Sequence, residues 1–344
     1  MATATSRLDT GYPQSINPVY PDWQSAMADA VTDLGQLCGL LDLPEAGPHT
    51  PHWELQRFPL LVPKPYLARI RRGDPEDPLL LQILPHPAEL APQPGYSTDP
   101  VGESRTTRSS GILWKYPGRL LIVASRDCAV HCRFCFRRHF RGQVTPRKSG
   151  DFVPLLGAIQ AEKSIHEVII SGGDPLTLDD ALLAELVKRL TDIPHVQRVR
   201  LHTRLPVMIP QRVTEPLIAL LRSSRLSALV VIHVNHPREI DDAVAAAFSR
   251  LANAGVPLLS QSVLLRGVND RAEVLAELCE RLVNLRVMPY YLHQLDRVAG
   301  AAHFEVPEEV GCEIVRQLRA RLPGYAVPRY VREVAGEPSK RILA

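Results

Sequence analysis

The sequence predicts an α/β fold: a partial (βα)6 barrel that follows an N-terminal, mainly helical extension. From residue 120 onward, short apolar, β-branched runs alternate with amphipathic stretches. Six such strand–helix units favour parallel strands with right-handed crossovers, and six are fewer than the eight of a closed barrel. A doubly wound sheet has the same pattern. The barrel is preferred because the unusual polar residues lie at or just after strand ends, where they could share one barrel mouth.

Periodicity predicts each element in turn. Residues 1–20 are expected to form a polar tail, residues 22–43 a helix, and the Pro-rich stretch 84–111 an irregular connection. Strands are expected at 120–125, 166–171, 196–203, 228–235, 257–264 and 285–292. Helices are expected at 151–162, 178–190, 213–223, 240–253, 271–283 and 307–321. We therefore divide the chain into a helical extension with its connection, residues 1–110, and a barrel domain, residues 111–344.

Composition argues against several classes of protein. The net charge of +3 is too small to indicate nucleic-acid binding, and no apolar run is long enough to span a membrane. The polar N-terminus does not resemble a signal peptide, and six cysteines in 344 residues favour a reducing cytoplasm over a disulfide framework. Three of these cysteines, Cys38, Cys279 and Cys312, fall in helical patterns and are expected in the core.

The other three cysteines, Cys128, Cys132 and Cys135, lie within eight residues in a C-x3-C-x2-C loop after the first strand. Thiolates are the usual ligands of iron–sulfur clusters, and three of them would leave one iron open to another ligand. A zinc site completed by His131 or His139 is an alternative, but zinc modules usually bring a second ligand pair, which we do not find. Three structural core cysteines are a further alternative, although clustering in an Arg-rich loop is unusual for them.

Further motifs follow the other strands. Gly172, Gly173 and Asp174 form a turn after the second strand, which could bind an ammonium or ribose group or simply cap a helix. His233 ends the fourth strand. Lys340, in the segment GEPSK, would by itself be interpreted as a surface amine.

Together these motifs identify a resemblance. From about Pro59 onward the chain resembles the lysine 2,3-aminomutase family of radical S-adenosylmethionine enzymes, through the segments KYPGR, CAVHCRFCFRR, SGGDPL, HVNHP, GVND, MPYYLHQLD and GEPSK. The resemblance implies an isomerase that moves the amino group of L-lysine from Cα to Cβ. It also implies three cofactors: a [4Fe–4S] cluster, S-adenosylmethionine and pyridoxal 5′-phosphate. No side-chain base can remove hydrogen from the unactivated Cβ, so the cofactors must supply this step.

The resemblance assigns roles to individual residues. The cluster would be bound by Cys128, Cys132 and Cys135. S-adenosylmethionine would be bound by Gly172, Gly173, Asp174, His233 and Gln261. Lys340 would bind pyridoxal phosphate covalently, with Lys115, Tyr116 and Arg119 near its ring or phosphate. Arg137 would bind the substrate carboxylate, and Asp296 and Glu333 the distant ammonium group of lysine.

Departures from the catabolic lysine enzymes suggest a branch within the family. Those enzymes usually carry Asp where this chain has Glu333, and they continue past the cofactor lysine into a cysteine-bearing tail. The chain instead resembles the enzymes that make (R)-β-lysine for elongation factor P. Its pathway partner would then be a lysyl-tRNA-synthetase-like ligase, and its electron donor a flavodoxin or ferredoxin. A catabolic lysine or glutamate aminomutase, a non-catalytic iron–sulfur protein and a zinc-dependent nucleic-acid binder remain alternatives.

Overall fold

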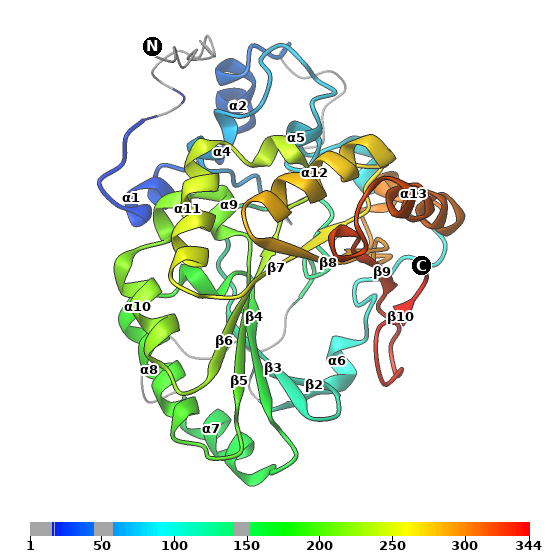
Figure 1. Cartoon of the computed structure of the whole chain (residues 1–344). Helices are drawn as coiled ribbons and strands as arrows, with labels where there is room; N and C mark the ends of the chain where they lie inside the picture. The colour runs from blue at the N-terminus through cyan, green and yellow to red at the C-terminus, as the bar shows by residue number, and fades with distance from the viewer. Residues whose placement is uncertain (1–15, 17, 45–57, 110, 141–151) are drawn as a thin grey trace.

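A ten-stranded sheet organises the protein. The computed structural model describes residues 16, 18–44, 58–109, 111–140 and 152–344 (Figure 1). The strands lie in the sheet in chain order, from β1 to β10. Their bounds are β1 Thr107–Ser109, β2 Ile112–Tyr116, β3 Arg119–Ser125, β4 Glu167–Gly172, β5 Arg198–Thr203, β6 Ser227–His233, β7 Leu258–Val263, β8 Val287–His293, β9 Arg329–Arg332 and β10 Arg341–Ile342. β1 and β10 form opposite edges, so the barrel is open.

The six predicted strand–helix units are confirmed. Strands β3 to β8 pair in parallel in sequence order, and an α-helix follows each of them on the outer side of the curved sheet (Figure 1). These helices are α7 Phe152–Ala161, α8 Asp180–Thr191, α10 Glu215–Ser223, α11 Asp242–Asn253, α12 Ala272–Asn284 and α13 Glu308–Arg321. Each buries an apolar stripe; in α12, for example, Leu275, Leu278 and Leu282 are each 1% exposed. This is the architecture of a partial barrel.

The sheet extends beyond the predicted six strands at both edges. β9 adds a seventh parallel strand beside β8, and β10 folds back on it as an antiparallel hairpin. At the other edge, β1 and β2 are antiparallel, with β2 leading into β3 through a tight turn at Gly118. The short helix α6, Glu103–Thr106, precedes β1 and lies close to the β9–β10 hairpin (Figure 1). The two ends of the barrel domain therefore meet across its open side.

The single helix predicted over 22–43 is wrong. Two short helices occupy this stretch, α1 Trp23–Ala28 and α2 Leu34–Leu40. Between them Val31 forms an antiparallel bridge with Val62, and the carboxylate of Asp33 caps the start of α2. A tertiary contact has thus overridden a continuous apolar period.

The remaining short elements continue the extension into the predicted irregular connection. They are α4 Lys64–Leu67, α5 Pro78–Leu81 and η1 Pro87–Leu90. Between the barrel strands and helices lie η3 Pro175–Thr177, α9 Leu205–Met208, η4 Pro210–Arg212, η5 Pro237–Glu239, η6 Ala302–Phe304 and η7 Gly324–Ala326. Of the predicted core cysteines, Cys38 and Cys279 are buried and Cys312 is half-buried.

The extension packs against the cysteine loop and shares one hydrophobic core with the barrel. The backbone N–H groups of His131 and Arg133 donate to the carbonyls of Leu61 and Gln82, both at 2.9 Å. Glu89, whose side chain is 4% exposed, accepts from the guanidiniums of both Arg133 and Arg138. Burial acts to raise the pKa of Glu89, but the two guanidiniums outweigh it and hold that pKa below its ordinary value. Residues of the extension therefore hold the cysteine loop in place.

Candidate active site

One cavity of about 950 Å³ occupies the interior of the barrel, and every residue to which the family resemblance assigned a role lines it. Each strand directs every second side chain into the barrel, so polar residues from different strands, far apart in the sequence, face the same space. The residues brought together are Lys115, Tyr116, Arg119, Cys128, Cys132, Cys135, Arg137, Gly172, Gly173, Asp174, His233, Gln261, Asp296, Glu333 and Lys340. The cavity runs from the cysteine loop to the β9–β10 hairpin.

The three loop cysteines are neighbours in this cavity. Burial raises the pKa of each thiol, and their mutual repulsion as thiolates raises the pKa of Cys128 and Cys135 further, that of Cys135 to about 11. A guanidinium opposes this effect at Cys132, where Arg204 Nη1 donates to Sγ at 2.7 Å. Thiols in such a place become thiolates when a metal replaces their protons. The donor set therefore fits a thiolate-bound cluster.

The zinc alternative gains no support. No group of three His, Cys, Asp or Glu side chains within the described ranges lies close enough to hold a single metal ion. Cys-bound zinc needs its ligands about 2.3 Å from one centre, whereas a cluster binds its thiolates at different irons. The two histidines also have other partners, since His131 Nδ1 lies 2.8 Å from the carbonyl of Pro59 and His139 Nε2 lies 2.9 Å from that of Ala299.

Gly172 and Gly173 lack side chains, and this allows the turn at the end of β4 to pack directly against the backbone at the start of the cysteine loop. A Cβ at Gly172 would lie 2.3 Å from the carbonyl oxygen of Ser125, and one at Gly173 would lie 2.5 Å from that of Asp127. The Gly173 N–H also donates to the Ser125 carbonyl at 2.6 Å. The sequence suggested that these glycines admit a ligand; in the structure, the space of each missing side chain is filled by the chain itself.

The carboxylate of Asp174 joins the ends of β4 and β5. It accepts hydrogen bonds from Thr203 Oγ1 at 2.7 Å, from the backbone N–H groups of Arg204 and Leu205 at 2.7 and 2.9 Å, and from that of Leu176 at 3.0 Å. Asp174 is 4% exposed, and burial raises its pKa. This carboxylate is largely saturated by the chain, so its first effect is to position the turn.

His233 and Gln261 face the cavity from the neighbouring strands β6 and β7, at paired positions. His233 Nε2 lies 3.1 Å from Oδ1 of Asn235, and its ring packs against Phe134. Burial lowers the pKa of His233 to about 3, so the imidazole is neutral. A neutral imidazole beside an amide can donate to or accept from a polar ligand without adding charge.

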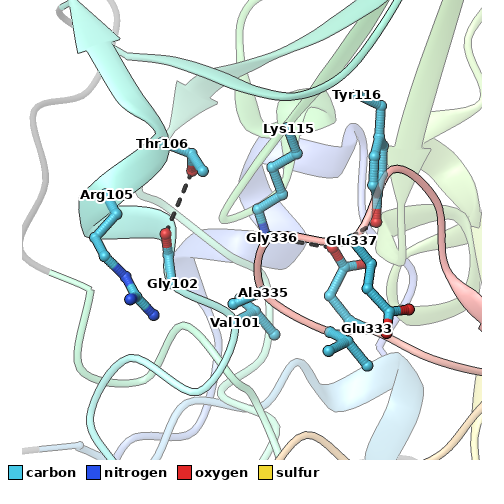
Figure 2. A pocket seen from close by; sticks show the side chains of 11 residues that line it. Val101, Gly102, Arg105, Thr106, Lys115, Tyr116, Glu333, Ala335, Gly336 and Glu337 are labelled. Carbon is cyan, nitrogen blue, oxygen red and sulfur yellow. Dashed lines mark hydrogen bonds and ion pairs between the residues drawn. The ribbon is translucent and has the colours of Figure 1, made fainter.

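Lys340 lies at the other end of the cavity, in the loop between β9 and β10, where its amine pairs with Glu333. Glu333 also accepts from Tyr116 Oη at 2.6 Å and lies 3.5 Å from Lys115 Nζ. Figure 2 shows Lys115 and Tyr116, both from β2, directed towards this carboxylate beside a smaller pocket of about 240 Å³. Burial acts to raise the pKa of Glu333, but Lys340 and Lys115 outweigh it and lower that pKa. The guanidinium of Arg119 lies over the Tyr116 ring.

Arg137 is held by a carboxylate that the sequence did not reveal. Its Nε and Nη2 donate to Glu103 of α6 at 2.9 and 2.7 Å, while Nη1 donates to Ser171 Oγ and to the Gly172 carbonyl at 3.2 and 3.0 Å. The side chains of Arg137 and Glu103 are 12% and 5% exposed. One edge of the guanidinium is therefore already paired, and any further anion meets the remaining N–H of Nη2 unless Glu103 moves.

Asp296 differs from every other acid in the cavity. Its carboxylate makes no hydrogen bond or ion pair with the part of the chain that the structure describes. Burial raises its pKa to about 7; Glu333 raises it as well, while Lys340 opposes the change. A half-buried carboxylate that lacks a partner and lines a cavity is costly to keep ionised, and this favours a cationic ligand beside it.

Other cavity residues were missed because strand periodicity alone does not distinguish an inward polar side chain from a solvated one. Arg200 and His202 alternate on β5, and His293 ends β8. Burial lowers the pKa of both histidines well below the ordinary value, with Lys340 contributing to each shift. The alternation of Arg200 and His202 within a predicted strand was the signal that could have placed them in the barrel interior.

Comparisons with known proteins agree with this site. The Radical SAM superfamily profile matches residues 122–279. The chain is 44% identical to an L-lysine 2,3-aminomutase of Haemophilus influenzae over 94% of this chain and 96% of that protein. It is 42% identical to one of Escherichia coli over 95% of each chain. It is 38% identical to one of Clostridium subterminale over 80% of this chain and 66% of that protein.

These matches confirm the predicted family and isomerase class, and the sheet confirms the predicted fold class. Radical SAM proteins use a [4Fe–4S] cluster and S-adenosylmethionine, and lysine 2,3-aminomutases use pyridoxal 5′-phosphate as well. None of the helices in the described ranges is both long and apolar enough to cross a membrane. The chain belongs to the L-lysine 2,3-aminomutase family of radical S-adenosylmethionine isomerases.

Proposed function

We propose that this chain converts L-α-lysine into (R)-β-lysine with pyridoxal phosphate bound to Lys340. The observation that carries the proposal is Asp296, a half-buried carboxylate that has no hydrogen-bond or ion-pair partner among the described residues and lines the cavity that also holds Lys340 and the cysteine loop. A positively charged group on the substrate would supply the missing partner. Lysine has such a group at its far end, whereas glutamate would bring a second negative charge to this place.

The chain's own residues would bind the substrate at both ends. Asp296 binds the ε-ammonium group, and Glu333, which forms ion pairs with Lys340 and Lys115, is the second acid beside it. Arg137 offers its remaining N–H to the α-carboxylate while Glu103 fixes its orientation. When bound, the cofactors supply the hydrogen abstraction and the migration of nitrogen, which side chains cannot perform. The walls of the barrel would keep bulk water away from the substrate and the reacting groups.

The same cavity supports a proposal for where the cofactors bind. Lys340 provides the amine for pyridoxal phosphate, with Lys115, Tyr116 and Arg119 around it. For S-adenosylmethionine we propose the region between the cysteine loop and the ends of β4, β6 and β7, which contributes Gly172, Gly173, Asp174, His233 and Gln261. Because the Asp174 carboxylate is occupied by the chain, the backbone of this turn is better placed to bind the ligand than the acid itself.

We further propose that the β-lysine product serves elongation factor P, through a lysyl-tRNA-synthetase-like ligase. Supporting this are the identities to the Haemophilus and Escherichia proteins, 44% and 42%, which exceed the 38% identity to the clostridial protein, and the glutamate at position 333. A flavodoxin or ferredoxin would supply the electron. A catabolic role for the same reaction is the alternative.

Two measurements test the proposed reaction. Reconstituted enzyme is incubated without oxygen with L-lysine, S-adenosylmethionine and a reductant, and the products are separated on a chiral column. We expect (R)-β-lysine and no product from L-glutamate; turnover of glutamate in preference to lysine would refute the substrate assignment.

The covalent lysine is identified separately, by borohydride reduction and peptide mapping. Label should appear on Lys340 and disappear in Lys340→Ala, whose iron content stays normal. Lys188→Ala, which changes an exposed lysine of α8, is the matched control and should keep the label. Label on any of the five other lysines would show that the cofactor site is misplaced.

A further inference from the structure

Arg204, which follows β5, is a buried arginine that bonds to a cysteine of the loop. It is 6% exposed, and its Nη1 donates to Cys132 Sγ at 2.7 Å. The other terminal nitrogen, Nη2, donates to Gln82 Oε1 at 2.6 Å and lies 3.3 Å from both carboxylate oxygens of Glu239. Glu239 is fully buried. The guanidinium of Arg204 therefore contacts the sulfur of Cys132 with one nitrogen and the carboxylate of Glu239 with the other.

Neighbouring residues fix the position of the Arg204 guanidinium, so that it stays directed at Cys132 and Glu239. The backbone N–H of Arg204 is bound to Asp174 at 2.7 Å, and the guanidinium lies over the Phe134 ring, 5.5 Å from its centre. Glu239 accepts from Gln82 Nε2 at 2.8 Å and from the backbone N–H of Asn235 at 3.3 Å, so the anion is fixed as well. The extension, through Gln82, completes the arrangement. Its geometry is that of a preorganised donor aimed at one thiolate.

We propose that Arg204 and Glu239 set the reduction potential of the cluster bound by Cys132, Arg204 raising it and Glu239 lowering it. The proposal rests on the cluster assignment but not on lysine being the substrate. A cluster gains negative charge on reduction, so a nearby positive N–H donor stabilises the reduced form and a nearby carboxylate destabilises it. Low local dielectric strengthens both effects because the pair is out of water.

A purely structural role is the competing interpretation, in which Arg204 only neutralises Glu239 and closes the core. The two interpretations predict different directions for the shifts in reduction potential of the two variants. If the pair is structural, removing either member loosens the loop, and any change in potential has the same direction for both. If the pair tunes the cluster, removing the cation and removing the anion shift the potential in opposite directions.

The experiment is an anaerobic redox titration of the reconstituted cluster, followed by electron paramagnetic resonance, without lysine. We expect Arg204→Gln to shift the midpoint potential to more negative values and Glu239→Gln to shift it to more positive values. Arg204→Lys keeps the charge but not the fork and should fall between wild type and Arg204→Gln. Arg225→Gln removes a charge of the same sign at the opposite ends of the strands and should leave the potential unchanged.

Shifts of the same sign in Arg204→Gln and Glu239→Gln, or no shift in either, would overturn the proposal. If Arg204→Gln fails to bind iron, Glu239→Gln decides alone, because it leaves the contact with Cys132 intact. Loss of the cluster in both variants, with an unchanged circular dichroism spectrum, would assign the pair to holding the loop and would also refute the tuning role.

Discussion

Asp296 offers the sharpest test of the proposed substrate site, because its carboxylate is half-buried, has no partner within the described chain and has a pKa raised to about 7. An ammonium group binds the ionised carboxylate. In the lysine-free enzyme at pH 6, about one carboxyl in ten is ionised, so lysine binding should weaken about tenfold per pH unit below 7 and level off above about pH 8. This pH dependence is diagnostic, because lysine binding to a carboxylate of ordinary pKa would not change between pH 6 and 8.

Asp296→Ala removes the charge altogether. Loss of one partner from a buried charge pair costs about 3–5 kcal/mol, which corresponds to roughly two to three and a half powers of ten in kcat/KM for lysine. Asp296→Asn should lose a similar amount and should also abolish the pH slope. Iron content and S-adenosylmethionine binding should be unaffected, since the carboxylate contacts neither the cysteine loop nor the turn at Gly172.

The assay is initial-rate formation of β-amino acid from L-lysine and from L-norleucine, which lacks the ε-amine, between pH 6 and 8.5. Wild type should strongly prefer lysine, and Asp296→Ala should lose this preference because only the lysine rate falls. Asp192→Ala, which removes an exposed acid after α8, controls for net charge. If Asp296→Ala lowers the two rates equally, or leaves the lysine rate unchanged, the carboxylate does not bind the ammonium group.

The remaining predictions concern the cluster, the second acid and stability. Alanine at any one of the three loop cysteines should abolish bound iron and turnover; full iron content with normal activity would disprove the cluster assignment. Glu333→Asp should reduce kcat/KM less than Asp296→Ala, because the charge that faces Lys340 is kept; steady-state kinetics decide. In the cofactor-free protein, Asp296 has a higher pKa folded than unfolded, so the folded state binds more protons between about pH 4 and 7 and stability falls as pH rises through this interval. Asp296→Asn should therefore raise Tm most at pH 8, less at pH 5 and hardly at all below pH 4, as measured by calorimetry. Glu89→Gln should destabilise the protein by about 3–5 kcal/mol in urea titrations, because it leaves two buried guanidiniums without their anion.

The barrel was predictable because its signals are local and repeated. Each of the six strands was recognised as an apolar run between turn residues, and its partner helix as an amphipathic period, so errors at the ends amount to a few residues. The extension was harder to predict. The apolar period over residues 22–43 is continuous, yet the bridge between Val31 and Val62 interrupts the helix. The sequence around Val31 does not indicate that it pairs with a residue 31 positions away.

The site was predictable in its members but less so in its contacts. Motifs and family resemblance selected residues that all line one cavity. Local sequence contains no record of the pairing of Arg137 with Glu103, which comes from a Pro-rich stretch without periodicity, or of the bond from Arg204 to Cys132. Such pairs join residues separated by tens of positions, and only the folded chain brings them together. The same holds for Asp174, whose carboxylate is occupied by donors from β5.

Besides the bond from Arg204 to Cys132, several contacts that hold the cysteine loop do not involve its sulfur atoms. Backbone bonds to Leu61 and Gln82, and the carboxylate of Glu89 between Arg133 and Arg138, hold the loop from the outside. Ordering a free loop costs about 1–2 kcal/mol per residue, a cost that this protein meets when it folds and not when iron arrives. Oxidative loss of the cluster should therefore leave the cysteine loop in its folded conformation. Rebuilding the cluster should then need iron, sulfide and reduced thiols, but no refolding of the loop.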